Sequence, residues 1–597
     1  MSTTSHADLH YCPDYFAYSR RKSREITVGN VGIGGDNPIR VQSMITSDTR
    51  DTEACVKQVL DLAEAGCEIV RITAQTKKYA ANLEHIRDGV RAAGCDVPLV
   101  ADIHFKPDAA FEAAKWVEKI RVNPGNYADK KKFEIREYTD DQYTAELERI
   151  REDFAPLVEL CKELGRAMRI GTNHGSLSDR IMNRYGDTPL GMVESALEFA
   201  RIARELDYHN FCFSMKASNP KVMIEAYRLL VARLDQEGDD WNYPIHLGVT
   251  EAGDGEDGRI KSAIGIGSLL ADGVGDTIRV SLTEDAIHEI PVAKAIIANI
   301  ENSQLPTDPS GSQRGTLSYD PFSYERRRAH KLELNGHQLG GDNTIRVFTS
   351  RKKWDALAHK IDKLGDFTPE IVAEDTPIHA IDPWDAASIQ KLNEIIEPQL
   401  VTVADGCHGA AVIHAFRLLA SKLAAHHPIL LKDTLTPSTD SNADFIDTLI
   451  TAARNIGSLL CDGIGDAILI QGEEAPGQSL RLAYNVLQAA GSRIFKTDYV
   501  ACPSCGRTLF NLQETTQKIR AATGHLKGVR IAIMGCIVNG PGEMADADFG
   551  YVGGAPNKIN LYVGKQAVKF NIPEDEAVER LIDLITEHDK WIDAPVA

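Results

Sequence analysis

Three cysteines near the end of the chain have the spacing of metal ligands. Cys502 and Cys505 are separated by two residues, and Cys536 lies further along. A turn predicted at Pro503 and Gly506 lets both sulfurs of the first pair point toward one metal centre. Three thiols form an incomplete ligand set, so we expect a fourth ligand from a neighbouring segment.

Glu543 is the nearest candidate for that fourth ligand. It follows Cys536 by seven positions, after the tight turn Asn-Gly-Pro-Gly at 539–542, which bends the chain back toward whatever Cys536 holds. A carboxylate is a harder and more weakly held ligand for iron than a thiolate. In such a site, we expect the Glu543 corner to be the one that a substrate can displace.

Other interpretations of the same cysteines remain open. Cys502 and Cys505 also match the knuckle of a zinc ribbon, although a ribbon needs a second pair of ligands and Cys536 stands alone. A thioredoxin-like redox pair needs a strand-helix-strand unit, and no such pattern is predicted around the two cysteines. Spacing alone does not decide between an iron-sulfur cluster, a structural zinc ion and a redox or disulfide-forming thiol pair.

The composition indicates a chain with several globular domains. At 597 residues the chain exceeds the size of a single core, and 43% hydrophobic and 25% charged residues are typical of soluble proteins. No run of eighteen apolar residues occurs, so no membrane span is predicted. Residues 1–24 lack the apolar region of a secretory signal and do not have the composition of an organelle transit peptide.

Charge and cysteine usage limit the partners and the compartment. A formal net charge of -20 argues against nucleic acid as a partner, because binding it requires a basic face. An anionic small substrate needs only a few local cations. Eleven cysteines, scattered singly apart from one pair, fit a reducing compartment. We therefore expect a cytoplasmic protein with no membrane or nucleic-acid partner.

Strand-like and helical segments alternate over residues 1–300. The expected strands are 39–44, 68–73, 98–103, 119–124, 167–172, 210–215, 244–249 and 276–281. Amphipathic segments such as 52–65 and 188–206 lie between them. Eight strands with crossover helices over about 250 residues predict a (β/α)8 TIM barrel in an α/β protein.

The expected strands end in polar residues, and chemistry in this fold occurs at those ends. The residues are Arg71, Asp102, His104, Arg121, Asn123, Asn173, His174, Lys216, Ser218, Glu251, Arg279 and Ser281. Four of them are cations from different strands. Guanidinium and ammonium groups suit phosphate oxygens, so we expect a doubly phosphorylated or otherwise polyanionic small molecule in the barrel mouth.

These strand-end segments, together with the motifs around Cys502, Cys505, Cys536 and Glu543, resemble the 4-hydroxy-3-methylbut-2-enyl diphosphate synthase family. Members are iron-sulfur reductases of the non-mevalonate isoprenoid pathway. The resemblance covers the first barrel and the last hundred residues. It implies a [4Fe-4S] cluster on the three cysteines and Glu543, with reduced ferredoxin or flavodoxin as the electron donor.

The resemblance also implies the reaction, the reductive ring opening of 2-C-methyl-D-erythritol 2,4-cyclodiphosphate to 4-hydroxy-3-methylbut-2-enyl diphosphate. The residues expected to bind this cyclic diphosphate are Arg71, Arg121, Asn123, Asn173, Lys216, Ser218, Arg279 and Ser281. Asp102, His104 and Glu251 are candidates for hydroxyl binding and proton delivery, and Glu251 is the preferred proton donor. The alternative is a non-redox TIM-barrel enzyme whose terminal domain holds structural zinc.

Residues 301–490 form a second, shortened copy of the barrel. The segment 340–347 matches 34–41 at seven of eight positions, and 457–468 matches 267–278 at nine of twelve, which indicates an internal duplication. Where the first copy has Arg279, the second has Leu469. We therefore predict a structural, barrel-like domain without a second active site, as in the three-domain members of the family from plants and some bacteria.

Residues 491–597 are expected to form a small α+β domain that carries the cluster. The predicted elements are a helix at 513–522, strands at 529–533, 549–552, 559–563 and 567–570, and a closing helix at 575–587. This domain has to cap a barrel mouth for the cluster to reach the substrate. In two-domain relatives the cap comes from the other subunit, so we expect a homodimer here, although the inserted copy offers a way for one chain to cap itself.

Overall fold

The computed structural model describes residues 9–103, 106–127, 137–301, 316–365, 367–407, 411–437, 444–537, 540–544 and 546–594. The chain packs into two compact units. The first contains residues 1–21, 260–274 and 295–495, and the second contains residues 22–259, 275–294 and 496–597. The predicted domain boundaries at 300 and 490 stay predictions. In the described ranges, none of the helices combines the length and apolar character needed to cross a membrane.

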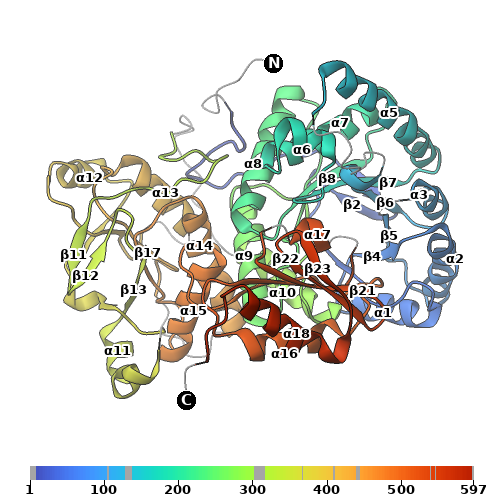
Figure 1. The fold of residues 1–597 in the computed structure, drawn as a ribbon. Helices are drawn as coiled ribbons and strands as arrows, with labels where there is room; N and C mark the ends of the chain where they lie inside the picture. Colours follow the sequence, from blue (N-terminus) through green and yellow to red (C-terminus); the bar gives the residue numbers. More distant parts are fainter. Residues whose placement is uncertain are drawn as a thin grey trace. The chain divides into compact units, whose positions relative to one another are not determined.

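A parallel eight-stranded barrel is the core of the second unit (Figure 1). Its strands are β3 (Arg40–Met44), β4 (Ile69–Ala74), β5 (Leu99–Ile103), β6 (Lys119–Val122), β7 (Ala167–Asn173), β8 (Phe211–Lys216), β9 (His246–Leu247) and β10 (Thr277–Ile278). Neighbours pair in the order β8-β7-β6-β5-β4-β3-β10-β9. A parallel bridge between Phe213 and Ile245 joins the two ends. The predicted TIM barrel is confirmed.

Helices connect the strands, as the sequence period predicts. They are α1 (Thr52–Glu64), α2 (Lys77–Ala92), α3 (Pro107–Ala114), α4 (Pro124–Tyr127), α5 (Asp140–Glu163), α6 (Asp179–Tyr185), α7 (Pro189–Glu205), α8 (Pro220–Glu237), α9 (Gly255–Ala271) and α10 (Glu289–Glu301). Side chains cap several helix starts. Asp51 accepts a hydrogen bond from Ala54 N, and Thr139 forms a capping box with Gln142.

A short hairpin closes the amino-terminal end of the barrel. Its strands β1 (Ile26–Val28) and β2 (Val31–Ile33) are antiparallel. Ile26, Val28 and Ile33 pack against a buried cluster contributed by four barrel strands, namely Ile69, Val100, Ala167 and Cys212. The glycines after this hairpin serve the turn, since Gly34 has a φ of +82°. The polar interior of the barrel therefore opens at the carboxyl ends of the strands.

The second copy is a six-stranded parallel sheet in the first unit. Its strands are β13 (Arg346–Thr349), β14 (Ile371–Val372), β15 (His379–Ile381), β16 (Val401–Val403), β17 (Leu430–Lys432) and β18 (Ala467–Leu469). They pair in the order β14-β13-β18-β17, a bridge from Val401 to Ile429 adds β16, and β15 follows. A hairpin of β11 (Leu332–Leu334) and β12 (His337–Leu339) precedes them, as β1 and β2 precede the first barrel. The helices of this copy are α11 (Arg351–Leu357), α12 (Ala386–Asn393), α13 (Val412–Lys422), α14 (Phe445–Cys461) and α15 (Pro476–Ala489).

Matching positions of the two copies face each other within the first unit. Ser268 on α9 donates to Ser458 on α14 at 2.6 Å, and these serines occupy the same position of the repeat. Arg417 on α13 pairs with Asp272 at 2.5 Å and with Asp462 at 2.9 Å, again one aspartate from each copy. Equivalent residues of the two repeats therefore contact each other within the first unit.

The terminal domain is a five-stranded sheet with helices, part of the second unit. Its elements are β19 (Asp498–Ala501), α16 (Leu512–Thr523), β20 (Arg530–Met534), α17 (Gly540–Glu543), β21 (Phe549–Ala555), β22 (Lys558–Val563), β23 (Gln566–Pro573) and α18 (Glu574–Glu587). β19, β20 and β21 are parallel, while β22 and β23 are antiparallel additions. Its apolar core includes Ile531, Ile533 and Leu581.

One expectation about this domain is wrong. A strand-helix-strand unit does surround Cys502 and Cys505, because β19 ends at Ala501 and runs parallel to β20 with α16 between them. β19, which has four residues, was not among the strands predicted from the sequence. However, α16 begins only at Leu512, so neither thiol lies at a helix N-terminus, the position that activates thiols in thioredoxin-like pairs.

Candidate active site

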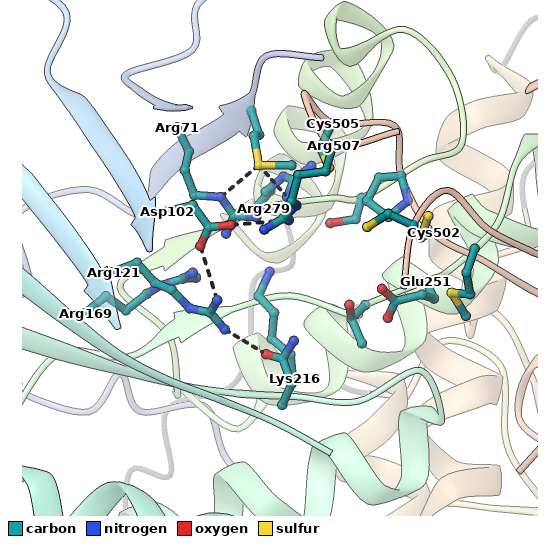
Figure 2. A pocket seen from close by; sticks show the side chains of 17 residues that line it. Arg71, Asp102, Arg121, Arg169, Lys216, Glu251, Arg279, Cys502, Cys505 and Arg507 are labelled. Carbon is teal, nitrogen blue, oxygen red and sulfur yellow. Dashed lines mark hydrogen bonds and ion pairs between the residues drawn. The ribbon is translucent and has the colours of Figure 1, made fainter. Parts of the chain in front are cut away.

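One cavity in the second unit collects side chains from all eight barrel segments and from the terminal domain (Figure 2). The barrel contributes Met44, Arg71, Asp102, Arg121, Arg169, Asn173, Lys216, Thr250, Glu251, Arg279 and Ser281. The terminal domain contributes Cys502, Pro503, Cys505, Arg507, Met534 and Cys536. The cation-bearing barrel mouth and the three cysteines thus face the same space.

Positive charge dominates the lining. Six cationic side chains and two carboxyl groups line the cavity. Burial and the neighbouring guanidinium groups of Arg169 and Arg279 lower the pKa of Lys216 well below its ordinary value. Burial also lowers the pKa of Arg71 well below its ordinary value, against the raising effect of Asp102. This excess of desolvated positive charge favours an anion in the cavity.

Asp102 connects the barrel to the cysteine loop. Its Oδ1 lies 3.2 Å from Nη1 of Arg121, and its Oδ2 lies 3.6 Å from Nη2 of Arg507. Arg507 is two residues after Cys505. Burial alone would lower the pKa of Arg507, but Cys505 and Asp102 beside it raise the value above the ordinary one. Arg507 therefore stays charged between the barrel carboxylate and the thiols.

Arg279 is held by a buried carboxylate that the sequence did not single out. Its Nη2 lies 3.3 Å from Oε1 of Glu289 at the start of α10. Glu289 also accepts from Ser43 Oγ at 2.6 Å and from Leu282 N at 3.1 Å. With three donors on one carboxylate, the Arg279 guanidinium has a fixed orientation toward the cavity.

Glu251 and Glu543 form a carboxyl pair at the edge of the cavity. Burial and the nearby Glu543 raise the pKa of Glu251 well above its ordinary value. Asn173 Nδ2 donates to Oε1 of Glu543 at 2.5 Å. Oε2 of Glu543 is buried and has no hydrogen-bond partner among the described residues. The Glu251 carboxyl group therefore holds its proton more strongly than an ordinary glutamate does, and Asn173 holds one oxygen of Glu543.

Backbone contacts seat the terminal domain on the barrel mouth of the same chain. A Cβ on Gly175, which has a φ of +78°, would lie 2.0 Å from the carbonyl oxygen of Gly542. Gln75 Nε2 donates to Gly506 O at 3.3 Å, and Thr283 Oγ1 donates to Cys502 O at 3.1 Å. The three contacts hold the loop of Cys502 and Cys505 and the Glu543 turn at the strand ends. The cavity is complete within one chain, and the expected homodimer stays a prediction.

The cysteines fit a group larger than a single metal ion. A zinc site needs its sulfurs about 2.3 Å from one point, and no three His, Cys, Asp or Glu side chains in the described ranges are arranged to hold one ion. Cys502, Cys505 and Cys536 nevertheless line one cavity. The Gly535 N–H points at Sγ of Cys502, 3.1 Å away, an interaction that stabilises metal-bound thiolates. The donor set of three thiols with the nearby Glu543 carboxylate fits an iron-sulfur cluster.

Most of the site residues predicted from sequence surround this cavity. Arg71, Asp102, Arg121, Asn173, Lys216, Glu251, Arg279, Ser281 and the three cysteines line it. Glu543 is adjacent through Asn173. Asn123 and Ser218 are not among the lining residues, and His104 lies outside the described residues.

Arg169 and Arg507 line the cavity and were not predicted as site residues. Figure 2 shows Arg121 and Arg169 on one side of the space and Cys502 and Glu251 on the other. Arg169 is on β7 in the same alternation as Gly171 and Asn173, so the two-residue period of a strand was the signal that could have identified it. Burial and Arg121 lower the pKa of Arg169 to about 10.

The fold and the cavity define a TIM-barrel enzyme whose mouth is closed by a cysteine-bearing domain of the same chain. Residues 23–294 match the GcpE TIM-barrel domain, and residues 498–587 match the GcpE protein C-terminal domain. The chain belongs to the GcpE family, whose curated members below are named as 4-hydroxy-3-methylbut-2-en-1-yl diphosphate synthases.

Three relatives cover nearly the whole chain. The enzyme named 4-hydroxy-3-methylbut-2-en-1-yl diphosphate synthase (flavodoxin) from Akkermansia muciniphila is 62% identical, over 98% of this chain and 99% of its own. The protein of the same name from Leptospira interrogans is 46% identical, over 97% and 98%. The chloroplastic (ferredoxin) synthase from Oryza sativa is 44% identical, over 98% and 89%. The family expectation from the sequence motifs is confirmed.

Proposed function

We propose that this chain catalyses the reductive ring opening of 2-C-methyl-D-erythritol 2,4-cyclodiphosphate to 4-hydroxy-3-methylbut-2-enyl diphosphate, with electrons from reduced flavodoxin or ferredoxin. The observation that carries the proposal is that six cations and three cysteines line one cavity. The printed names of the relatives support the same reaction and the same class of donor. A cyclic diphosphate matches the charge of the cavity, and a reduction matches its thiols.

The cations bind and orient the substrate. Arg71, Arg121, Arg169, Lys216 and Arg279 neutralise the two phosphoryl groups, whose negative charge offsets the cost of burying these side chains together. Glu289 orients Arg279, and Asp102 orients Arg121 and Arg507. Asn173 and Ser281 add neutral polar groups at the rim of the same space. Binding therefore fixes the ring relative to the cysteine loops.

Glu251 supplies the proton that the reaction consumes. Opening the ring and removing its hydroxyl uses two electrons and one proton, releases water and leaves a linear diphosphate with one more negative charge. The hydroxyl is a poor leaving group unless it is protonated as its C–O bond breaks. Burial and the nearby Glu543 raise the pKa of Glu251, so this carboxyl group holds a proton more strongly than an ordinary glutamate does. Asp102 and His104 are further candidates for hydroxyl binding.

The terminal domain excludes water and carries the redox group. Cys502, Cys505, Cys536 and Glu543 would hold a [4Fe-4S] cluster, which supplies electrons one at a time when it is bound. Asn173 holds the Glu543 carboxylate by its Oε1, and the seated loops around Gly506 and Gly542 close the mouth. Closure keeps bulk water away from the reacting ring.

The remaining parts of the chain have supporting roles in this proposal. The copy in the first unit is structural, since Leu469 replaces the arginine that corresponds to Arg279. We place the enzyme in the cytoplasm, and we retain a homodimer as a proposal.

Anaerobic turnover tests the function. The protein, reconstituted with iron and sulfide and given the cyclodiphosphate and a chemical reductant, should form the linear diphosphate, detected by phosphorus NMR. Glu543→Ala should retain the protein fold but lose most turnover, while Glu53→Ala on the outer helix α1 should behave as wild type. Absence of product from wild type with a full complement of iron and sulfide would refute the proposal.

A further inference from the structure

The loop that carries Glu251 has an unusual backbone. Glu251 has a φ of +48°, and Gly253 and Gly255 have φ values of +94° and +58°. A long side chain in the left-handed region is strained and persists only where the surroundings impose that conformation. Glycine adopts such angles without this cost, so the strain in the loop is concentrated at Glu251.

Part of what imposes this conformation comes from the terminal domain. Ala252, the next residue, forms a parallel bridge with Ala501, the last residue of β19. Thr283 links both sides, because its N–H donates to Gly253 O at 3.0 Å and its hydroxyl donates to Cys502 O at 3.1 Å. The Glu251 backbone is therefore fixed between the barrel and the first cysteine.

An ion-pair cluster then ties the end of the loop to the same domain. Arg520 on α16 lies 2.9 Å from Asp254 Oδ1 through Nη1 and 2.8 Å from Asp257 Oδ2 through Nη2. Lys496 Nζ lies 2.7 Å from Asp257 Oδ1. The Arg520 guanidinium also lies over the Tyr499 ring at 5.0 Å. The side chains of Arg520 and Asp254 are 27% and 14% exposed, so solvent screens this pairing only in part.

We propose that Arg520 is a positioning residue that holds loop 250–257 against the terminal domain and thereby keeps Glu251 in its strained, site-facing conformation. This inference rests on the proposed role of Glu251 as proton donor. One planar guanidinium bridges Asp254 of the loop and Asp257 in the first turn of α9, which a lysine cannot do with the same geometry. When the terminal domain is not seated, these contacts are absent and the loop is free to relax. Arg520 thus couples closure of the mouth to placement of the acid.

Three variants of the reconstituted enzyme test the proposal, with steady-state kinetics and amide hydrogen exchange as readouts. Arg520→Ala should lower kcat about tenfold or more while KM for the cyclodiphosphate changes less than about threefold, because the phosphate-binding cations are untouched. Amide exchange in 250–257 should accelerate, with unchanged iron and sulfide content. Arg520→Lys should recover only part of kcat. Asp254→Asn should reproduce the effect from the loop side.

The matched control is Arg530→Ala. Arg530 pairs with Asp498 at 2.8 Å inside the terminal domain and is similarly exposed, so its loss should leave kcat and loop exchange as in wild type. Unchanged kcat in Arg520→Ala, or a loss of kcat without faster exchange at 250–257, would overturn the proposal. The exchange measurement does not depend on turnover, so a failure of the proposed reaction in wild type is distinguishable from a failure of this inference.

Discussion

Asn173 Nδ2 lies 2.5 Å from Oε1 of Glu543, so the last residue of barrel strand β7 supports the carboxylate that we propose as the fourth cluster ligand. Oε2 of Glu543 has no partner among the described residues. A side chain held by one oxygen can present the other to a metal. The barrel therefore contributes to the cluster site as well as to substrate binding.

Replacing Asn173 tests this relationship. Asn173→Ala should lower kcat/KM about tenfold to a hundredfold, since a hydrogen bond to a charged group contributes about 1.5–3 kcal/mol. Anaerobic kinetics of Asn173→Ala, Glu543→Gln and the double variant give the coupling energy. Asn82→Ala, which removes an amide donor to Thr49 O outside the cavity, serves as the control. Effects that add within about 0.5 kcal/mol would mean that the two side chains act independently.

A matched pair of glycines tests the seating of the terminal domain. Gly175 and Gly94 both have a φ of +78°, but a Cβ on Gly175 would meet Gly542 O at 2.0 Å, whereas a Cβ on Gly94 would meet nothing within 4 Å. Both alanine variants incur the same backbone cost. We expect Gly175→Ala to lose about tenfold to a hundredfold in turnover and Gly94→Ala to remain close to wild type. Equal losses in both variants would contradict the contact.

Arg169 should destabilise the ligand-free protein and stabilise the complex. Burial lowers its pKa to about 10, and its Nη1 has no hydrogen-bond partner among the described residues. Thermal unfolding of Arg169→Met without ligand should therefore occur at a higher temperature than that of wild type, while the stabilisation by inorganic diphosphate should be smaller. A lower melting temperature for the ligand-free variant would show that Arg169 is satisfied without an anion.

Lys119 should make stability depend on pH in the alkaline range. Burial lowers its pKa from 10.5 to about 8, so between these values the unfolded chain binds more protons than the folded one. Below about pH 8, burial of the charged Lys119 side chain destabilises the fold by up to about 3 kcal/mol, and this destabilisation disappears as the pH rises toward 10.5. Lys119→Met should abolish this pH dependence. We expect chemical denaturation at pH 7.5 and 10 to show a larger rise in unfolding free energy for wild type than for the variant; parallel changes would contradict the shift.

The second copy should tolerate loss of Lys432, the last residue of its strand β17. Lys432 Nζ is paired with Asp405 at 2.7 Å, whereas no described side chain neutralises Lys216. Lys216→Met should lower kcat/KM about a hundredfold or more, because it removes a cation that contacts the phosphoryl groups. Lys432→Met should leave both kinetic constants within about twofold. A comparable loss in Lys432→Met would mean that the second copy takes part in the reaction.

The barrel was predictable because each strand is a short β-branched run followed by a polar residue. Arg71, Asp102 and Arg279 follow this pattern, and parallel strands bring such residues to one mouth. Arg169 was missed although it lies on the same face of β7 as Asn173, two alternations before the end of the strand. Glu289 was missed because it belongs to the helix after β10, and no sequence period links it to Arg279. Local patterns indicate which side chains point inward, but they do not identify which carboxylate pairs with which guanidinium.

In the terminal domain, too, local turns could be predicted from the sequence, whereas long-range contacts could not. The glycines around Cys505 and Glu543 predicted turns, but no local pattern indicated that Gly542 would meet Gly175 of the barrel, since each glycine only leaves space for the other. The short strand β19 (Asp498–Ala501) was not among the predicted strands. The ion pairs of Arg520 are long-range contacts, and their charges look like an ordinary helix surface in the sequence.

Ser268 and Ser458 occupy the same position of the repeat, but they are two different residues of one chain and can mutate independently. In an assembly of identical chains, a single mutation changes both sides of a two-fold contact at once. Here each side mutates alone, so Gly267 can keep Arg454 as its neighbour while Gly457 keeps Ile264. Because the two repeats belong to one chain, each can change independently: the first can retain its cavity-lining residues while the second changes only the residues of its packing contacts.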